Sequence, residues 1–244
     1  MVTGFLNRSL LVTRPIIDSV EITKQLDREN KTVNIIFGPL FEIKALPINI
    51  STSHFQAIVV TSANAVRSLK RSNIAFKGPM YCIGEATAKV AKREGFSPLN
   101  ANGNSIDLRT MIINNANKKK DKMVYFRGEE VFSDLAGSLR ELGYQVDEAV
   151  CYKKEKLNLD KSIIEGIKDE KILGATFFSR QTVDLFFEQL STVPDKFISF
   201  CISDEVSKAY KSHSDGTSID IRISKSPNLR EMCKLIIEAP EFAG

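Results

Sequence analysis

Short apolar runs recur along the whole chain, each followed by a polar break and then by apolar residues at helical spacing. Leu10–Thr13 and Val33–Phe37 are nearly continuous in apolar side chains, as strands buried on both faces of a parallel sheet are. Arg14-Pro15 interrupts the first run, and the apolar positions from Ile16 to Leu26 indicate a helix that begins near the proline. The same signature predicts further strands at Ala57–Val60, Met80–Ile83, Met123–Phe126 and Ala175–Phe178.

This three-part pattern occurs twice in the same order. The first copy spans 10–26, 58–69 and 80–96, and the second spans 123–139, 175–190 and 197–212. Two matched sets of strand–turn–helix units predict two related α/β lobes of about a hundred residues each, with a cleft between them. Short connections between alternating strands and helices predict parallel, doubly wound sheets, which bind ligands outside the carboxyl ends of their strands.

Composition narrows the class of protein. The chain has 244 residues, of which 43% are hydrophobic and 26% charged, as in an ordinary globular protein. A net charge of +4 is too small to indicate nucleic-acid binding, so we expect no nucleic-acid partner, and it suits a small polyanionic substrate. Four widely spaced cysteines predict reduced packing residues, and only two histidines argue against a histidine-rich metal site.

The N-terminal segment and the absence of long apolar runs bear on localisation. MVTGFLNRSLLVTRP has no uninterrupted apolar region, so we expect no signal peptide. No stretch approaches the roughly eighteen apolar residues that a membrane span needs. We therefore expect a cytoplasmic protein without a membrane partner. Because no sustained heptad pattern is present, we expect a monomer.

Two strand ends carry residues suited to anion binding. Thr61, Ser62 and Asn64 open the helix after the strand that ends at Val60, where hydroxyl and amide groups can cap the first turn. The free N–H groups and the helix dipole also make such a turn an anion site, and capping alone stays open as the alternative. Gly84 and Thr87 repeat the arrangement one strand later, with no P-loop motif at either place.

The second copy of the pattern is chemically different. Ser203 is followed by Asp204-Glu205, and Arg127-Gly128 is followed by Glu129-Glu130, so carboxylates there would repel an anionic ligand. Arg14 and Arg127 end their strands at the same edge and can bind ligand carboxylates or form local salt bridges. Most anion binding is therefore expected in the segment 58–96.

Tyr152 lies in CYKKEKLNLD, a polar stretch that we interpret as a linker beside the cleft. Its phenol can donate or accept a proton, and a packing role is the alternative.

Together these motifs resemble the uroporphyrinogen-III synthase family. The resemblance covers nearly the whole chain in the right order, and it rests most on IVVTSANAV and YCIGEATA. The matching series is VTRP (12–15), VTSANAV (60–66), IGEATA (83–88), RG (127–128), LxxxLxxxGYxV (135–146), Tyr152, FFS (177–179) and CIS (201–203).

The resemblance implies a fold in which the lobes do not follow the duplication. Two parallel-sheet, flavodoxin-like α/β lobes would be joined by a two-stranded linker, with one lobe inserted in the other. Lobe one would comprise 1–38 with 156–244, lobe two 44–149, and the linkers 39–43 and 150–155.

The resemblance also implies an activity. Members of the family close hydroxymethylbilane into uroporphyrinogen III, with inversion of the last pyrrole ring and loss of water, so the enzyme is a hydro-lyase of heme biosynthesis. No cofactor and no metal would be needed. Two alternatives stay open: a non-catalytic, hinged two-lobe protein that binds a polycarboxylate or tetrapyrrole, and an inactive homologue retained for interaction.

Site residues follow by resemblance. Tyr152 matches a tyrosine proposed to assist departure of the substrate hydroxyl, and we expect it to be the catalytic residue. The chain departs from the family pattern at 129–132 and 204–206, which weakens the case for substrate contact by lobe one. The expected substrate-binding residues are Thr61, Ser62, Asn64, Gly84, Thr87, Arg14, Arg127, Ser179 and Ser203.

Overall fold

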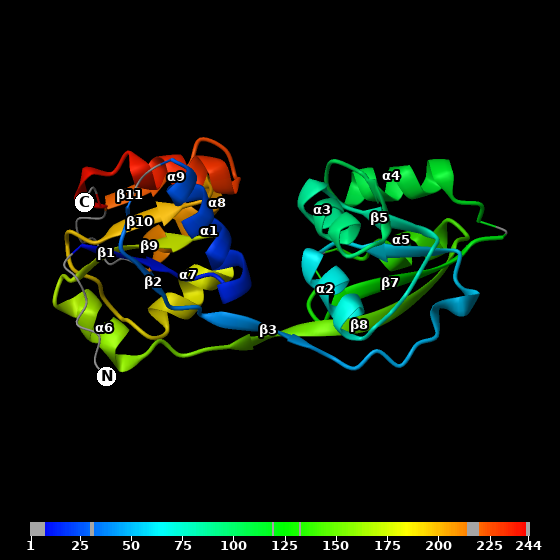
Figure 1. Ribbon diagram of the computed structural model, residues 1–244, viewed down its shortest axis with the longest axis horizontal. Coiled ribbons are helices and arrows are strands. Elements are labelled where there is room, and N and C mark those ends of the chain that lie inside the picture. Colours follow the sequence, from blue (N-terminus) through cyan, green and yellow to red (C-terminus); the bar gives the residue numbers. More distant parts are fainter. Residues whose placement is uncertain (1–7, 30–31, 119, 132, 214–219, 243–244) are drawn as a thin grey trace. The chain divides into compact units, whose positions relative to one another are not determined.

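The chain folds into two compact units, each built on its own sheet (Figure 1). The computed structural model describes residues 8–29, 32–118, 120–131, 133–213 and 220–242. Unit 1 comprises Met1–Glu42 with Glu155–Gly244, and unit 2 comprises Ile43–Lys154. The chain therefore leaves unit 1, builds the whole of unit 2, and returns to complete unit 1.

Unit 1 contains a five-stranded sheet in which every neighbouring pair is parallel. The spatial order is β11-β10-β9-β1-β2, which is 2-1-3-4-5 when the strands are counted along the chain within the unit, as in flavodoxin. The direction of winding reverses between β1 and β9. The strands are β1 (Ser9–Val12), β2 (Ile35–Phe37), β9 (Ile172–Phe177), β10 (Ile198–Cys201) and β11 (Asp220–Ile223).

Helices of unit 1 pack around this sheet in two neighbouring pairs. α1 (Ile16–Arg28) lies beside α9 (Leu229–Ile237), and α7 (Arg180–Phe187) lies beside α8 (Asp204–Ser212), while α6 (Lys161–Lys168) contacts β9. The buried strands and helix faces form one apolar cluster. Aromatic rings pack closely within it, with the Phe177 ring centroid 5.2 Å from that of Phe186 and 5.3 Å from that of Tyr210.

Unit 2 contains a six-stranded sheet in the order β3-β8-β7-β4-β5-β6. Its five strands from β4 to β8 form parallel neighbours, in the order 3-2-1-4-5 along the chain. The winding therefore reverses between β4 and β7. The strands are β3 (Phe41–Ala45), β4 (Ala57–Val60), β5 (Pro79–Cys82), β6 (Ser97–Asn100), β7 (Lys122–Gly128) and β8 (Gln145–Lys156).

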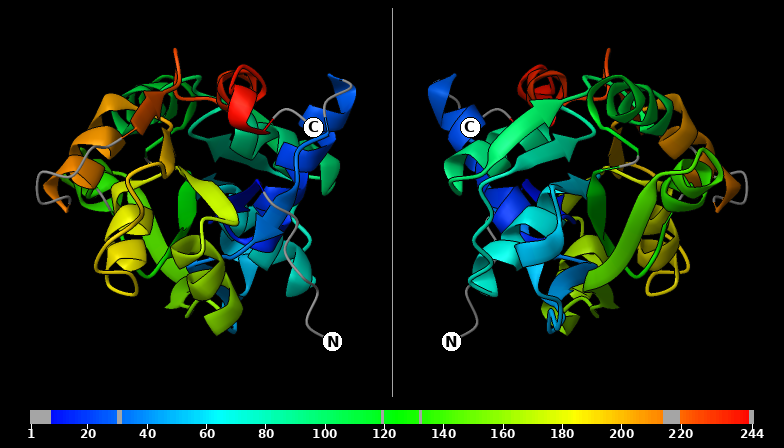
Figure 2. Two further views of the ribbon diagram at one scale, coloured as in Figure 1. Left: turned by 90° about the vertical axis from the view of Figure 1, so that its left-hand side faces the viewer. Right: turned by 90° about the vertical axis from the view of Figure 1, so that its right-hand side faces the viewer.

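Alternating side chains of the unit 2 strands pack into two separate apolar cores, because successive residues of a strand point to opposite faces of the sheet. Ile58 and Val60 of β4 pack with α2 (Ala63–Arg71) and α3 (Glu85–Arg93). Ala57 and Val59 pack with α4 (Ser105–Asn115) and α5 (Leu135–Glu141) on the other face. Helices thus cover both faces of the sheet, which is why its central strands β4, β5 and β7 are mostly apolar and buried (Figure 2).

Two strands carry the chain from one unit to the other. β3 and β8 are neighbours in the sheet, and both contain parts of the predicted linkers 39–43 and 150–155. The Leu157 amide donates to the Leu40 carbonyl at 2.9 Å, and the Leu46 amide donates to the Cys151 carbonyl at 3.0 Å. The polar stretch around Tyr152 is therefore part of a hydrogen-bonded strand.

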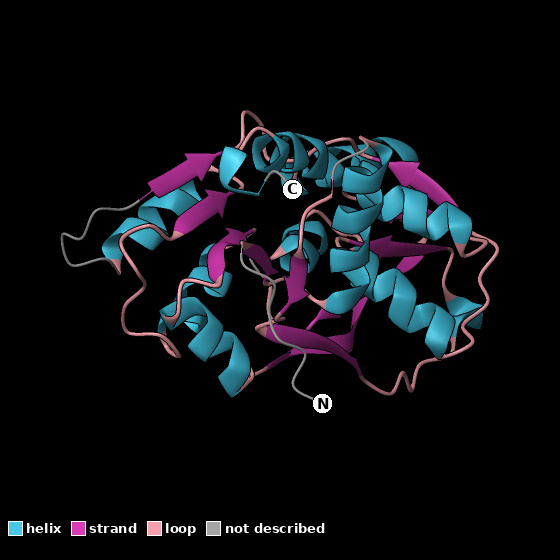
Figure 3. Cartoon of the chain, turned by 60° about the vertical axis from the view of Figure 1, so that its left-hand side comes forward, coloured by secondary structure: helices cyan, strands magenta, loops and turns pink. Residues whose placement is uncertain are grey.

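The six strands predicted from continuous apolar runs are all present, and the α/β class is confirmed (Figure 3). The duplicated pattern, however, does not mark the units. Its first copy supplies β1 and α1 to unit 1 but β4 to α3 to unit 2, and its second copy is divided as well. None of the helices in the described part of the chain has the length and apolar character that a membrane crossing requires.

Gly174 in β9 provides a test of the parallel pairing in unit 1. A Cβ atom added there would collide with the Ile198 carbonyl oxygen of β10 and lie 3.2 Å from the Ile198 carbonyl carbon. Because backbone cannot move aside cheaply, we expect Gly174→Ala to cost about 3 kcal/mol of unfolding free energy. We expect thermal denaturation to show a Tm lower by roughly 10 °C.

Gly84→Ala is the matched control for stability, since a Cβ there would meet only the Gly103 carbonyl oxygen at 4.0 Å. Its Tm should stay within about 2 °C of wild type. Equal Tm values for the two variants would contradict the β9–β10 register.

Candidate functional site

The winding of the unit 2 sheet reverses between β4 and β7, so the loops after these strands diverge and leave a ligand-accessible edge. Thr61 and Ser62 follow β4 directly, and Gly128 is the last residue of β7. Tyr152 lies opposite Gly128 in the neighbouring strand β8. The edge thus gathers three hydroxyl groups, from Thr61, Ser62 and Tyr152, around the end of β7.

A one-residue irregularity in β8 determines where Tyr152 points. Arg127 pairs with Val150 but Gly128 pairs with Tyr152, so Cys151 is an extra residue in the ladder. Cys151 and Tyr152 consequently both pack on the core cluster of α2 and α3, although consecutive strand residues normally face opposite sides. The Glu129 amide donates to the Tyr152 carbonyl at 3.0 Å and holds the shifted register.

Gly128 provides the surface on which the Tyr152 ring lies. A Cβ added at Gly128 would be 2.7 Å from Tyr152 Cζ and 2.9 Å from its phenolic oxygen. Such distances are shorter than Cβ atoms tolerate, so the ring occupies the space that any larger residue at Gly128 would fill.

Ser62 holds the other side of the Tyr152 phenol. It is the N-cap of α2, and its Oγ accepts a hydrogen bond from the Asn64 amide at 3.1 Å. With that lone pair occupied, the Ser62 hydroxyl proton is available for donation, and the Tyr152 phenol is near enough for this hydroxyl to lower its pKa. Burial raises the pKa of Tyr152 overall, and the nearby Ser62 hydroxyl only partly offsets this rise. At neutral pH the phenol is therefore protonated and can donate its own proton.

Thr61 links the two strands at the reversal point. Its Oγ1 lies 2.9 Å from the phenolic oxygen of Tyr125, a buried residue of β7 that faces α4 and α5. This bond fixes the end of β4 against β7. Burial also raises the pKa of Tyr125, so this phenol stays neutral.

The first turns of α2 and α3 have different caps. Asn64 accepts a hydrogen bond from Arg67 Nη1 at 2.7 Å through its side-chain oxygen. Gly84 is the N-cap of α3, and among the described residues no side chain caps that helix. Thr87 does not serve as a cap; it is 5% exposed and belongs to the packed side of α3. A Cβ at Gly84 would meet only the Gly103 carbonyl oxygen at 4.0 Å, so there is open space at the start of α3, whose first turn also carries the Glu85 carboxylate.

Arg127 is held by local contacts, as expected from the second of its two predicted roles, a local salt bridge. Its Nε donates to Glu148 at 2.7 Å, and its Nη1 donates to the carbonyl oxygens of Gly128 and Glu129 at 2.9 and 3.2 Å. Arg140 also donates to Glu148, at 2.9 Å. Burial alone would raise the pKa of Glu148, but hydrogen bonds from the two arginines outweigh it and the pKa is lowered. Arg127 therefore supports the turn that follows β7.

The predicted residues of unit 1 lie at the carboxyl ends of its own strands. The Arg14 guanidinium is 4.3 Å from the Phe178 ring centroid and 3.7 Å from the carboxylate of Asp18. Ser179 caps α7, accepting from the Thr182 amide at 3.2 Å, and Ser203 caps α8, accepting from the Val206 amide at 3.4 Å. These two serines therefore fill the capping role that Ser62 fills in unit 2.

Sequence reasoning did not single out Tyr125 or Gly128, although both contact predicted site residues. Tyr125 lies within an apolar run and is indistinguishable there from a packing residue. Gly128 stands out in the sequence only as part of the R-G pair. The strand register that brings Gly128 to Tyr152 links residues 24 positions apart, so no local pattern reveals it.

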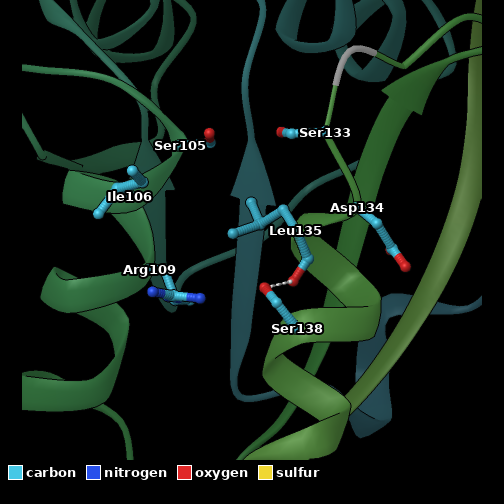
Figure 4. Close-up of a pocket in the computed structure, with 7 residues that line it drawn as sticks. All are labelled: Ser105, Ile106, Arg109, Ser133, Asp134, Leu135 and Ser138. Carbon is cyan, nitrogen blue, oxygen red and sulfur yellow. Dashed lines mark hydrogen bonds between the residues drawn. The ribbon is translucent and has the colours of Figure 1, made fainter.

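A separate cavity of about 180 Å³ opens between the first turns of α4 and α5 (Figure 4). It holds one basic and one acidic side chain, Arg109 and Asp134, and Asp134 Oδ1 already accepts a hydrogen bond from the Gly137 amide at 2.7 Å. None of the predicted site residues lines it. The lining residues are Ser105, Ile106, Arg109, Ser133, Asp134, Leu135 and Ser138.

The buried phenol of Tyr152 predicts a loss of stability at high pH. Burial raises its pKa above that of an unfolded tyrosine, so its stabilising contribution is complete below about pH 10 and is lost as the pH rises. We expect the free energy of unfolding, measured with urea, to fall above about pH 10, and Tyr152→Phe to make that fall less steep. Parallel curves for wild type and Tyr152→Phe between about pH 9 and about pH 11.5 would contradict a buried, neutral phenol.

Comparison with known proteins agrees with this architecture. The family model described as uroporphyrinogen-III synthase HemD matches residues 21–232. The structure of uroporphyrinogen-III synthetase from Helicobacter pylori is similar at a TM-score of 0.65 and 19% identity, over 94% of this chain and 98% of that one. A mutant uroporphyrinogen III synthase from Thermus thermophilus gives a TM-score of 0.51 and 13% identity, over 94% and 97%. No curated protein matches the chain. Since the family model spans most of its length, the chain belongs to the uroporphyrinogen-III synthase family.

Proposed function

We propose that this enzyme of tetrapyrrole synthesis is a hydro-lyase that cyclises hydroxymethylbilane to uroporphyrinogen III. The observation that carries the proposal is the position of the Tyr152 phenol, which lies against Gly128 at the end of β7 and near Ser62 at the start of α2. An acid at such an edge suits a reaction that begins with the departure of a hydroxyl group as water.

Tyr152 would act as the general acid in the first step. Its phenolic proton passes to the substrate hydroxyl as the carbon–oxygen bond breaks, which releases water and leaves an electrophilic azafulvene. The Ser62 hydroxyl, oriented by the Asn64 amide, donates to the phenolate that forms. This support lowers the energy of the charge that develops on Tyr152 in the transition state.

The remaining steps require position more than acid–base chemistry. Attack on the azafulvene by the substituted carbon of the last pyrrole ring gives a spiro pyrrolenine, which fragments and recloses with that ring inverted. The ring carbon that finally closes the macrocycle loses a proton, which restores the phenol. Uninverted closure gives the type I isomer, so holding the substrate in one geometry is the main catalytic contribution.

Carboxylate recognition would use helix N-termini and hydroxyl groups. In unit 2, we assign it to the starts of α2 and α3, which carry Thr61, Ser62, Asn64 and Gly84, with Thr87 packed behind the first turn of α3. In unit 1, we assign it to Arg14, Ser179 and Ser203, each placed after a strand. Arg127, which is bonded to Glu148, would support the site and not bind substrate directly.

Further features of the proposal concern the whole protein. One domain would comprise residues 1–38 with 156–244, and the other would comprise residues 44–149. Residues 39–43 and 150–155 would be the linkers between them. The protein would act as a cytoplasmic monomer, without a metal or an organic cofactor.

The function is tested by the isomer composition of the product. Purified protein should convert freshly generated hydroxymethylbilane mainly to uroporphyrinogen III, separated from the type I isomer after oxidation to the porphyrins. If folded protein gives only type I product at the rate of the protein-free reaction, the synthase proposal is wrong.

Removing the phenolic hydroxyl tests the role of Tyr152. We expect Tyr152→Phe to lower kcat by about 10²–10⁴-fold with little change in KM, because only proton donation is lost. Ser62→Ala should lower kcat less and should also cost about 1 kcal/mol of stability through loss of the α2 cap.

Asn228→Ala is the matched control for the cap, because Asn228 caps α9 by accepting from the Glu231 amide at 3.0 Å. It should lose similar stability and keep its kcat. A normal kcat in Tyr152→Phe would refute the general-acid assignment.

A further inference from the structure

We propose that Gly128 is a positioning residue for the reaction. Because glycine has no side chain, the Tyr152 ring can occupy the space that a Cβ at position 128 would fill. This inference rests on the proposed role of Tyr152 and extends it to a residue in a different strand. It assigns Gly128 a role in the rate of the acid step and not in the fold.

The contacts around Gly128 are specific to Tyr152. The three atoms nearest to an added Cβ are Cζ at 2.7 Å, Cε2 at 2.8 Å and the phenolic oxygen at 2.9 Å, and all belong to that ring. By contrast, the Cβ of an alanine at Gly174 would meet backbone of the next strand, and one at Gly84 would meet nothing closer than 4.0 Å. The functional side chain is therefore the first group that a larger residue at Gly128 would displace.

Backbone conformation does not require glycine at this position. Among the described glycines, only Gly95 and Gly143 have positive φ values, at 89° and 88°. Gly128 is thus in a conformation that an alanine adopts without strain. Its lack of a side chain is explained by the neighbouring ring alone.

The Tyr152 ring has little freedom to move while its phenol stays near Ser62. Relief of the 2.7 Å contact to an ordinary 3.4 Å would shift the ring by about 0.7 Å. Ser62 is fixed as the cap of α2, and Tyr152 is fixed in the register that the extra residue Cys151 creates. The displacement therefore falls on the phenol, and misplacement of a reacting group by about 1 Å can cost about 10²-fold in rate.

Gly128→Ala tests the inference directly. We expect kcat for uroporphyrinogen III formation to fall by about 10²-fold, with KM changed less than about threefold, and Tm to drop by only a few degrees. Gly137→Ala is the matched control: its Cβ would crowd the carboxylate of Asp134, the N-cap of α5, away from Tyr152. It should alter Tm without lowering kcat. An unchanged kcat in a folded Gly128→Ala protein overturns the inference.

A double-mutant cycle separates positioning from a general structural effect. If Gly128 acts only through the phenol, Gly128→Ala should lower kcat no further once Tyr152 is replaced by phenylalanine. Independent, multiplying losses in the double variant would show that Gly128 acts by another route.

Two measurements keep the inference testable when activity or folding fails. In protein labelled with ¹³C at tyrosine Cζ, the Tyr152 signal, assigned from Tyr152→Phe, should move most in Gly128→Ala; an unmoved signal overturns the inference. If Gly128→Ala does not fold, adding Tyr152→Ala to the same protein should restore folding, because the ring that the new Cβ would contact is removed. A double variant that still does not fold overturns the inference.

These readouts distinguish the two proposals. A wild-type protein that makes no type III isomer refutes the proposed function. The NMR shift tests the contact between Gly128 and Tyr152 and does not depend on enzymatic activity.

Discussion

The site depends on one extra residue in β8. Without Cys151 as the unpaired residue, the ladder with β7 would stay regular, and the residue after it would face α4 and α5. The shift turns Tyr152 toward α2, where Ser62 can bond its phenol, and brings its ring onto Gly128. A local change of strand register thus brings a side chain of β8 to the ends of β4 and β7.

The parallel sheet supplies the rest of the arrangement because it gathers strand ends and helix starts at one edge. α2 begins directly after β4, so the hydroxyl that caps the helix is also the one that reaches Tyr152. Arg127 holds the end of β7 through Glu148 and two backbone carbonyls, which fixes Gly128 in turn. The groups that stabilise the unit are therefore also the groups that orient the phenol, and loss of either function affects the other.

Sequence patterns predicted what depends on neighbouring residues. Continuous apolar runs identified buried strands such as Ala57–Val60, and the position of Ser62 after such a run identified a helix cap. Sequence patterns did not reveal the pairing between distant segments: nothing in the polar residues around Tyr152 indicates that β8, a strand of 12 residues, shifts its register against β7 at Cys151. The duplicated pattern predicted two α/β units, but its two copies do not coincide with them, because each copy supplies strands to both sheets.

The most direct test of this account is a crystal structure of the full chain, examined at β7 and β8. We predict electron density for the Tyr152 ring against the Cα atom of Gly128, with the phenolic oxygen within hydrogen-bonding distance of Ser62 Oγ and with Cys151 as the extra residue. A regular β7–β8 ladder, with Tyr152 turned away from Ser62 toward α4 and α5, would contradict it.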